Sequence, residues 1–343
     1  MKNLIVSSFK EGAGKTSLIV GLAKALGQGF GYLKPFGDRL TYRKKRLWDY
    51  DTALVANIFA LSLGSEEMTI GFEHAKLRYM YDEAAVKTKL LEIAAKQNKG
   101  NGILYIEAGS NLTCGASVFL DALSLAKYTG GKLIVVASGD EGSILDDITF
   151  LKKYVSMAGI DFALIVNKVS NVEDYKLTHL PDIQQMGISV LGVIPYVPDL
   201  TYATVNYYAE RLQAHIIGGE QGLNERVKYV FVGAMAGDTA ARLPLFKKEN
   251  KLAITGGDRA DMIVAALESN TAGIILTNNI LPPPNIIAKA SDRGIPLLLV
   301  PFDTYEAAKQ IEKMSPLLTK DDSQRIELLK QIIQRDVNLQ ALI

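Results

Sequence analysis

The chain has almost no cysteine and no long apolar segment. Its single cysteine, Cys114, cannot form a disulfide within the chain. No apolar run approaches the roughly 20 residues that a helix needs to cross a bilayer. The sequence also runs from Met1 directly into a predicted strand, without the features of a signal peptide. We therefore expect a cytoplasmic protein with no membrane partner.

An excess of charge of either sign is also absent. The 38 lysines and arginines nearly balance the 37 aspartates and glutamates, which leaves a formal net charge of +1. Such a chain has no general electrostatic attraction to nucleic acid or to an anionic membrane, so any charged partner must be recognised locally. The histidines are few and are not spaced as metal ligands, and we assign no chemistry to His74, His179 or His215.

What the sequence does contain is an alternation of apolar strands and helical patterns. Its 343 residues exceed what one typical hydrophobic core supports, so we expect two α/β domains. Short runs rich in β-branched residues predict a buried parallel sheet. These runs lie at residues 4–6, 103–106, 133–136, 163–166 and 191–194, and again at 229–232, 252–254, 274–276 and 297–300. We place a nucleotide-binding domain at 1–210, a smaller α/β domain at 211–318 and a C-terminal amphipathic helix at 319–343.

The C-terminal helix has one apolar face, formed by Ile326, Leu329, Ile333 and Val337. It could dock on the body of the chain or on another subunit. We favour docking within the chain, because an amphipathic helix is most often half buried in its own domain.

A glycine-containing loop between the first strand and the first helix carries the strongest functional signal. Gly12 and Gly14 allow the backbone to wrap so that its amides converge on the β- and γ-phosphates at the positive end of the helix. Lys15 adds a cation, and Thr16 can offer its hydroxyl to Mg²⁺. The predicted nucleotide contacts are Lys10, Glu11, Gly12, Ala13, Gly14, Lys15, Thr16 and Ser17. The alternative is a glycine turn without a ligand.

The standard pattern has its first glycine where this chain has Phe9, so the loop is a variant. Lys10 instead matches the signature lysine of the deviant phosphate loop in partition and nitrogenase-iron-protein ATPases. That resemblance implies a sandwich homodimer in which Lys10 reaches the partner's nucleotide and stabilises the transition state. The alternative is a solvated loop lysine.

Two acidic residues near predicted strand ends are candidate metal ligands. Glu107 ends the run 103–106, where it can hold Mg²⁺ or orient water, or can be a merely exposed acid. Asp51 is the second candidate and ranks above Asp49, although one of the two can be only a helix N-cap. We expect the metal ligands to be Thr16, Asp51 and Glu107, and the catalytic residues to be Lys10, Lys15 and Glu107.

Asn167 and Lys168 follow the strand at 163–166, again at the carboxyl edge of the sheet. An Asn amide can pair with both the donor and the acceptor edge of adenine, so we expect both residues to contact the nucleotide, together with Pro195. A simple polar turn is the alternative reading.

A basic stretch follows the predicted strand that ends at Lys34-Pro35. Its members are Arg39, Arg43, Lys44, Lys45 and Arg46. Such a run is usually a solvated loop. The functional alternatives are a surface for an anionic ligand or partner and a lid over the nucleotide.

Taken together, the first half resembles the dethiobiotin synthetase-like ATPase domain. The matching residues are Lys10–Thr16, Lys34-Pro35, Asp51, Glu107-Ala108-Gly109, Asn167-Lys168 and Gly192–Pro195. The second half resembles the DRTGG domain that follows this module in long phosphotransacetylases. That resemblance is carried by residues 254–261, 275–277, 295–296 and 301–305.

Departures from these families limit what the resemblance implies. The chain ends at Ile343, so we expect no acetyltransferase domain and no acetyl phosphate chemistry. The substrate residues around Lys34 do not match dethiobiotin synthetases. Asn278-Asn279 stands where the DRTGG resemblance leads us to expect a glycine pair.

Three functions remain open. The first is a Mg-ATP-binding regulator or sensor with slow or conditional ATPase activity, acting in trans on a phosphotransacetylase or related metabolic enzyme. The second is an ATP-dependent ligase or carboxylase of the dethiobiotin or cobyrinate-amidating type, with Lys34 lining its substrate pocket. The third is a dimerisation module held together by nucleotide.

Overall fold

The computed structural model describes residues 2–43, 46–61, 64–97, 102–314, 317–320 and 322–342. Lys44 and Lys45 of the basic stretch lie outside the described residues. The chain forms two compact units. Unit 1 comprises Met1–Val197 and Leu318–Ile343, and unit 2 comprises Pro198–Leu317. The boundary that the sequence suggests near residue 210 falls inside helix α9 (Val205–Leu212) of unit 2.

Unit 1 is built on a six-stranded sheet in the order β2-β5-β1-β6-β7-β8, and every neighbouring pair is parallel. The strands are β1 (Lys2–Ser8), β2 (Phe30–Leu33), β5 (Ile103–Glu107), β6 (Lys132–Ala137), β7 (Phe162–Val169) and β8 (Ser189–Pro195). Their near-continuous apolar sequences are buried because helices cover the sheet. The prediction of a parallel sheet flanked by helices is therefore confirmed.

All helices of unit 1 except α14 lie between these strands in the chain, and an antiparallel hairpin, β3 (Leu40–Arg43) and β4 (Arg46–Asp49), stands apart from the main sheet. The helices are α1 (Lys15–Leu26), α2 (Tyr50–Phe59), α3 (His74–Met80), α4 (Glu83–Gln97), α5 (Ala122–Thr129), α6 (Glu141–Ala158), α7 (Val172–Thr178), α8 (Leu180–Gln185) and α14 (Ser323–Asp336). Short 3₁₀ turns lie at η1 (Ser65–Met68), η2 (Ala116–Val118) and η5 (Leu339–Ala341).

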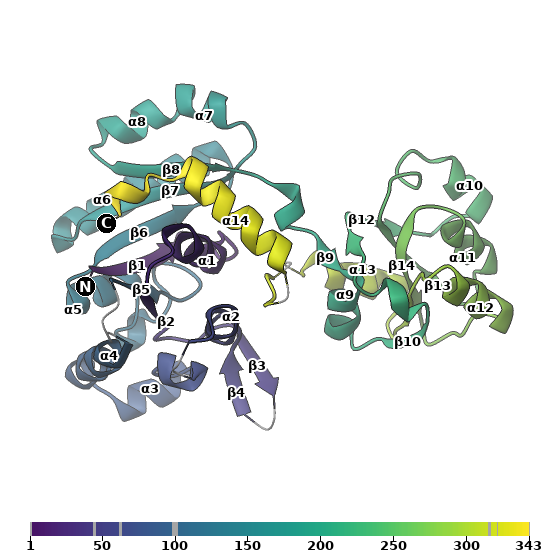
Figure 1. The fold of residues 1–343 in the computed structure, drawn as a ribbon, viewed down its shortest axis with the longest axis horizontal. Helices are drawn as coiled ribbons and strands as arrows, with labels where there is room; N and C mark the ends of the chain where they lie inside the picture. The colour runs from purple at the N-terminus through teal and green to yellow at the C-terminus, as the bar shows by residue number, and fades with distance from the viewer. Residues whose placement is uncertain are drawn as a thin grey trace. The chain divides into compact units, whose positions relative to one another are not determined.

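Helix α14 returns the end of the chain to unit 1, where it packs along α1 (Figure 1). The side chain of Ile333 lies so close to Gly21 that a Cβ on that glycine would meet it at 2.7 Å. The predicted apolar face is buried, and just beyond the helix Val337 forms a bridge to Gly192 of β8. The C-terminal helix thus docks within the chain.

Unit 2 is a smaller α/β domain with a five-stranded sheet in the order β10-β15-β14-β13-β12. The strands are β10 (His215–Gly218), β12 (Tyr229–Val232), β13 (Lys251–Gly256), β14 (Thr271–Thr277) and β15 (Leu297–Leu299), and only β10 pairs antiparallel in this sheet. Helices α10 (Gly237–Arg242), α11 (Ala260–Leu267), α12 (Pro284–Asp292) and α13 (Thr304–Glu312) follow the parallel strands. A small ladder joins β9 (Ala203–Thr204) to β11 (Arg226–Val227), and the remaining 3₁₀ turns are η3 (Pro198–Leu200) and η4 (Glu220–Gly222).

The alternation of side chains along these strands divides the core of unit 2 into two layers. Leu252 and Ile254 of β13 pack with α9 and α13 on one face of the sheet. Ala253 packs with α10, α11 and α12 on the other face. The smaller α/β domain that the sequence predicts is therefore present. Among the described residues, no helix is long and apolar enough to span a bilayer.

Candidate functional site

The phosphate loop, Lys10–Thr16, joins the carboxyl end of β1 to the first turn of α1. Gly12 has φ +74° and Gly14 has φ +99°, a left-handed backbone that glycine adopts without strain. Gly14 is the N-cap of α1, and no side chain caps the helix there. The amides at the positive end of the α1 dipole therefore remain available, which is the geometry that attracts phosphate.

Lys15 is largely buried and is held at the base of this loop. Its Nζ donates to Ser8 Oγ at 2.9 Å and to the Ser110 carbonyl at 2.8 Å. Burial lowers the pKa of Lys15 below its ordinary value, although Glu107 acts in the opposite direction. An ammonium carries three N–H donors, so one is left for a ligand oxygen.

Glu107 is buried at the end of β5 and accepts hydrogen bonds from two hydroxyl groups. Thr16 Oγ1 donates to Glu107 Oε1 and the Tyr32 hydroxyl donates to Oε2, each at 2.8 Å. Burial raises the pKa of Glu107 to about 7, and the nearby charge of Asp51 adds to that effect. The hydroxyl of Thr16 and the carboxylate of Glu107 are hard oxygen donors of the kind that Mg²⁺ prefers, so this pair fits the ion.

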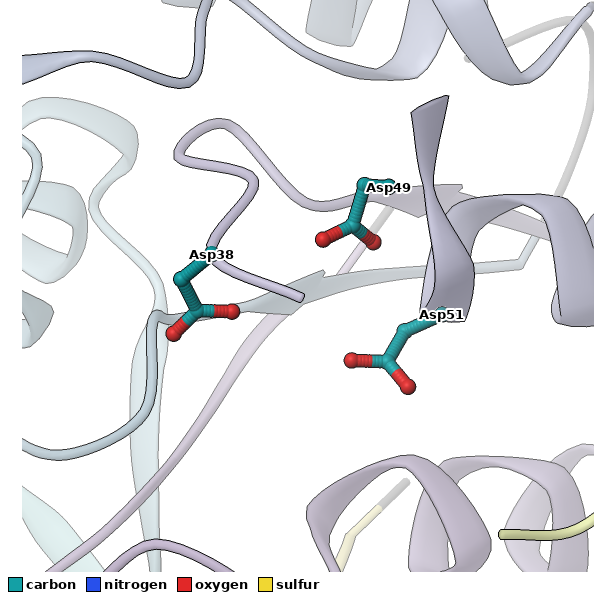
Figure 2. A group of neighbouring side chains, drawn as sticks. All are labelled: Asp38, Asp49 and Asp51. Atoms are coloured by element: carbon teal, nitrogen blue, oxygen red, sulfur yellow. The ribbon is translucent and has the colours of Figure 1, made fainter. Parts of the chain in front are cut away.

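Asp51 belongs to a group of ion-paired side chains that we call the Lys34 cluster, defined as Lys34, Asp38, Arg39, Asp49 and Asp51. The Lys34 ammonium contacts Asp51 at 2.6 Å, Asp38 at 2.7 Å and Asp49 at 3.3 Å. Figure 2 shows the three aspartates gathered around one space, and their oxygens lie within 4.8 Å of one another. Because Lys34 already contacts all three, the aspartates have a cationic partner without a metal ion.

The opposite charges of Lys34 and Asp51 stabilise each other's ionised forms. Burial acts to lower the pKa of Lys34, but the surrounding carboxylates, Asp51 above all, raise it well above its ordinary value. Burial acts to raise the pKa of Asp51, but Lys34 and Arg39 outweigh it and hold that pKa below its ordinary value. Asp49 caps α2 by accepting from the Thr52 amide at 3.0 Å. The N-cap is thus Asp49, whereas Asp51 forms ion pairs with Lys34 and Arg39, and its role as a metal ligand stays a prediction.

Asn167 and Lys168 contact the phosphate loop from the end of β7. Asn167 Nδ2 donates to the Ala13 carbonyl at 2.8 Å, and Lys168 Nζ donates to the Gly12 carbonyl at 2.7 Å. Asn167 Oδ1 also accepts from the Lys168 amide at 2.9 Å, and Lys168 has a left-handed φ of +63°. These residues hold the shape of the loop. Pro195 ends the adjacent strand in register with Val169.

Lys10 is directed to α6 of its own chain. Its Nζ donates to Ser143 Oγ at 3.0 Å and lies 3.9 Å from Asp147 Oδ2. Glu11 is exposed and Ser17 is partly buried.

In the basic stretch, Arg39 pairs with Asp51 at 3.1 Å and Arg46 with Glu66 at 3.1 Å, so these two arginines of the hairpin region take part in ion pairs.

A family profile described as an AAA domain matches residues 2–204. This chain belongs to that AAA domain family. A second profile, the DRTGG domain, matches residues 208–314 and confirms the predicted order of the two domains.

Curated relatives of the AAA and DRTGG domains are named phosphate acetyltransferase. The protein from Nitrosomonas europaea is 22% identical over 100% of this chain and 51% of its own length. The protein from Pseudomonas putida is 24% identical over 97% of this chain and 50% of its own length. The chain thus spans about half the length of the curated relatives it matches. The solved MinC:MinD cell division protein complex of Aquifex aeolicus is 20% identical to this chain. The match covers 58% of this chain and 84% of that one, with a TM-score of 0.38.

Several residues that contact Lys15, Lys34 or Glu107 were not identified from the sequence. Tyr32 lies two residues before Lys34, and the alternation along an extended segment could have placed both on one side. Asp38 lies four residues after Lys34, a spacing that could have suggested an ion pair. Ser110 contributes only a backbone carbonyl, and no residue type signals that role.

Proposed function

We propose that this chain binds Mg-ATP at its phosphate loop and acts as a cytoplasmic regulator or sensor with slow or conditional ATPase activity. The observation that carries the proposal is the left-handed backbone at Gly12 and Gly14, which leaves the start of α1 uncapped beside Lys15 and Thr16. The partner that we favour is a phosphate acetyltransferase or a related metabolic enzyme, because the relatives carry that name.

Thr16 and Glu107 are the residues that would hold Mg²⁺ in this proposal. The ion would supply the positive charge that neutralises the β- and γ-phosphates. Lys15 would add its remaining N–H donor to the same phosphates while Ser8 and Ser110 fix its position. Asn167 and Lys168 would act as positioning residues, since their bonds to Ala13 and Gly12 maintain the loop before nucleotide arrives. An adenine contact from Asn167 stays a prediction and would use its second N–H or its second lone pair.

A ligase or carboxylase that uses Lys34 to bind an anionic substrate is the less favoured function. The Lys34 side chain is 2% exposed, and its ammonium already contacts three carboxylates. An anionic substrate would have to displace these carboxylates, which is costly because it leaves the buried Asp49 and Asp51 without a cation. The Lys34 cluster therefore favours a structural role for this lysine over substrate binding.

The proposed ATPase activity includes a nucleotide-dependent homodimer in which Lys10 reaches the partner's nucleotide. To do so, Lys10 must leave Ser143 and Asp147 of its own chain. That release costs little, because Lys10 is half exposed and a long, exposed ion pair contributes about 1 kcal/mol or less.

Sedimentation velocity with and without Mg-ATP, together with a phosphate-release assay, tests this step. We expect Lys10→Ala to lose ATP-dependent dimerisation and hydrolysis while its affinity for Mg-ATP stays close to that of the unaltered chain. Lys176→Ala, which removes a surface lysine of α7, is the matched control. Unchanged dimerisation and hydrolysis in Lys10→Ala would contradict the role of Lys10. Strong dimerisation of the unaltered chain without phosphate release would favour a dimerisation module over a sensor.

A sensor must also transmit the nucleotide state to its second domain. Amide hydrogen exchange over residues 208–314 should therefore change when Mg-ATP is added. The Lys15→Ala chain provides the control, since it should show no such change. Identical exchange in the DRTGG domain with and without bound nucleotide would contradict the sensor function.

A further inference from the structure

A cavity in unit 1 lies apart from the phosphate loop, beside the β3–β4 hairpin. Its volume is about 390 Å³, within the range of about 300–1,000 Å³ that small-molecule sites occupy. Its lining residues are Arg46, Leu47, Glu66, Thr69, Ile70, Gly71 and Phe72. We call it the hairpin cavity. Neither the nucleotide proposal nor the comparisons assign it a ligand.

One wall of the hairpin cavity is fixed by backbone hydrogen bonds. The Ile70 amide donates to the Pro35 carbonyl at 2.8 Å, and the Gly37 amide donates to the Gly71 carbonyl at 3.0 Å. The ring of Phe72 packs on Gly37 so closely that a Cβ on that glycine would meet it at 2.6 Å. A wall held in this way binds a ligand without first being ordered, which favours affinity.

The chemistry of the lining is mainly apolar with a few polar groups. Leu47, Ile70 and Phe72 supply apolar surface. The hydroxyl of Thr69 is buried, and among the described residues it has no hydrogen-bond partner. Rotation about the Cα–Cβ bond moves a threonine hydroxyl among three staggered positions, so this group can turn to a ligand without breaking a hydrogen bond.

Arg46 is the group at the rim that can recognise a small anion. Arg46 Nη1 makes both hydrogen bonds to Glu66, at 3.1 and 3.4 Å, and both side chains are well exposed. Such a pair is weak, so a ligand carboxylate can share or replace Glu66 on the planar guanidinium. Arg46 and Glu66 together carry no net charge, and the negative Glu66 disfavours a multiply charged phosphate.

We propose that the hairpin cavity binds a small monocarboxylate with an apolar group. The carboxylate would bond to Arg46 and to the Thr69 hydroxyl, and the apolar group would lie against Phe72, Ile70 and Leu47. This site goes beyond the nucleotide function, and its test contains no nucleotide. A failure of ATP binding and a failure of carboxylate binding are therefore distinguishable.

Methyl NMR spectra of the full chain, with benzoate as the probe, test the proposal. We expect benzoate to shift the methyl signals of Ile70 and Leu47 in a saturable way, and benzamide, its neutral analogue, to bind several-fold more weakly. Arg46→Gln should raise the benzoate dissociation constant about fivefold or more, and Thr69→Val should raise it by a smaller factor. Arg242→Gln, on the exposed surface of α10, is the control and should leave it unchanged.

Two results would overturn the proposal. One is the absence of any saturable shift of Ile70 and Leu47 in a chain whose methyl spectrum shows that it is folded. The other is equal binding of benzoate and benzamide with no effect of Arg46→Gln, which would show that the cavity takes apolar molecules without recognising a carboxylate.

Discussion

Lys34 in unit 1 and Lys251 in unit 2 are both buried, but their positive charges are stabilised in different ways. In unit 1, the Lys34 ammonium lies among three carboxylates, and its pKa is raised well above the ordinary value. In unit 2, Lys251 at the start of β13 donates to the Asn270 carbonyl at 3.1 Å and lies 4.6 Å from the ring centroid of Phe246. Burial lowers the pKa of Lys251 to about 8.

The difference shows where the chain concentrates charge. The carboxyl edge of the unit 1 sheet carries buried Lys15, Lys34, Asp51 and Glu107, whose charges shift one another's pKa. The corresponding edge of the unit 2 sheet carries neutral hydroxyls, such as Thr255 and Thr277. Groups of buried charges with shifted pKa values are typical of functional sites, so the contrast favours unit 1 as the place of chemistry.

The largest expected effect comes from removing the Lys34 ammonium. Lys34→Met leaves the buried Asp49 and Asp51 and the partly exposed Asp38 without their shared cation and should destabilise unit 1 by about 3–5 kcal/mol. Native-state hydrogen exchange in β2 and α2 measures this loss, and adding Asp51→Asn should restore part of it. A loss below about 1 kcal/mol would mean that the cluster behaves as a surface ion pair.

The pH dependence of unit 1 gives the next largest effect. Glu107 has a folded pKa of about 7 against an ordinary value of 4.5, so the folded chain binds more protons than the unfolded chain between these values. Stability should therefore fall by about 2–3 kcal/mol as pH rises through that window. Glu107→Gln should remove this slope, whereas the surface control Glu173→Gln should keep it. A slope that survives in Glu107→Gln would assign the effect to another group.

Lys251 should give the smallest effect, and one of opposite sign to that of Lys34. Lys251→Met replaces an ammonium that has no carboxylate partner among the described residues, so we expect unit 2 to gain on the order of 1 kcal/mol at neutral pH. The unaltered chain should become more stable as pH rises from about 8 to 10.5, because the unfolded lysine then binds more protons than the folded one. Hydrogen exchange over β13 at two pH values measures both the stability gained in Lys251→Met and the pH dependence of the unaltered chain. A large loss of stability would remove the contrast between the two lysines.

The fold was more predictable than the site, for physical reasons. Apolar strand runs and the spacing of Gly12, Gly14 and Lys15 are local patterns, and they predicted the parallel sheet and the glycine loop. The contacts of Lys34 with Asp49 and Asp51 depend on how the chain returns to Lys34 after the β3–β4 hairpin, which no local pattern encodes. Asn167 could be placed at the edge of the sheet from sequence, but its bond to the Ala13 carbonyl joins residues 154 positions apart.

The most direct test of the account is calorimetric titration of Mg-ATP and Mg-GTP into the full chain, the Lys15→Ala variant and the Lys176→Ala control. We predict saturable binding of Mg-ATP to the unaltered chain and to Lys176→Ala, weaker binding of Mg-GTP, and loss of binding in Lys15→Ala. Equal binding by all three chains would place the nucleotide outside the phosphate loop, and no binding by any of them would contradict the nucleotide function itself.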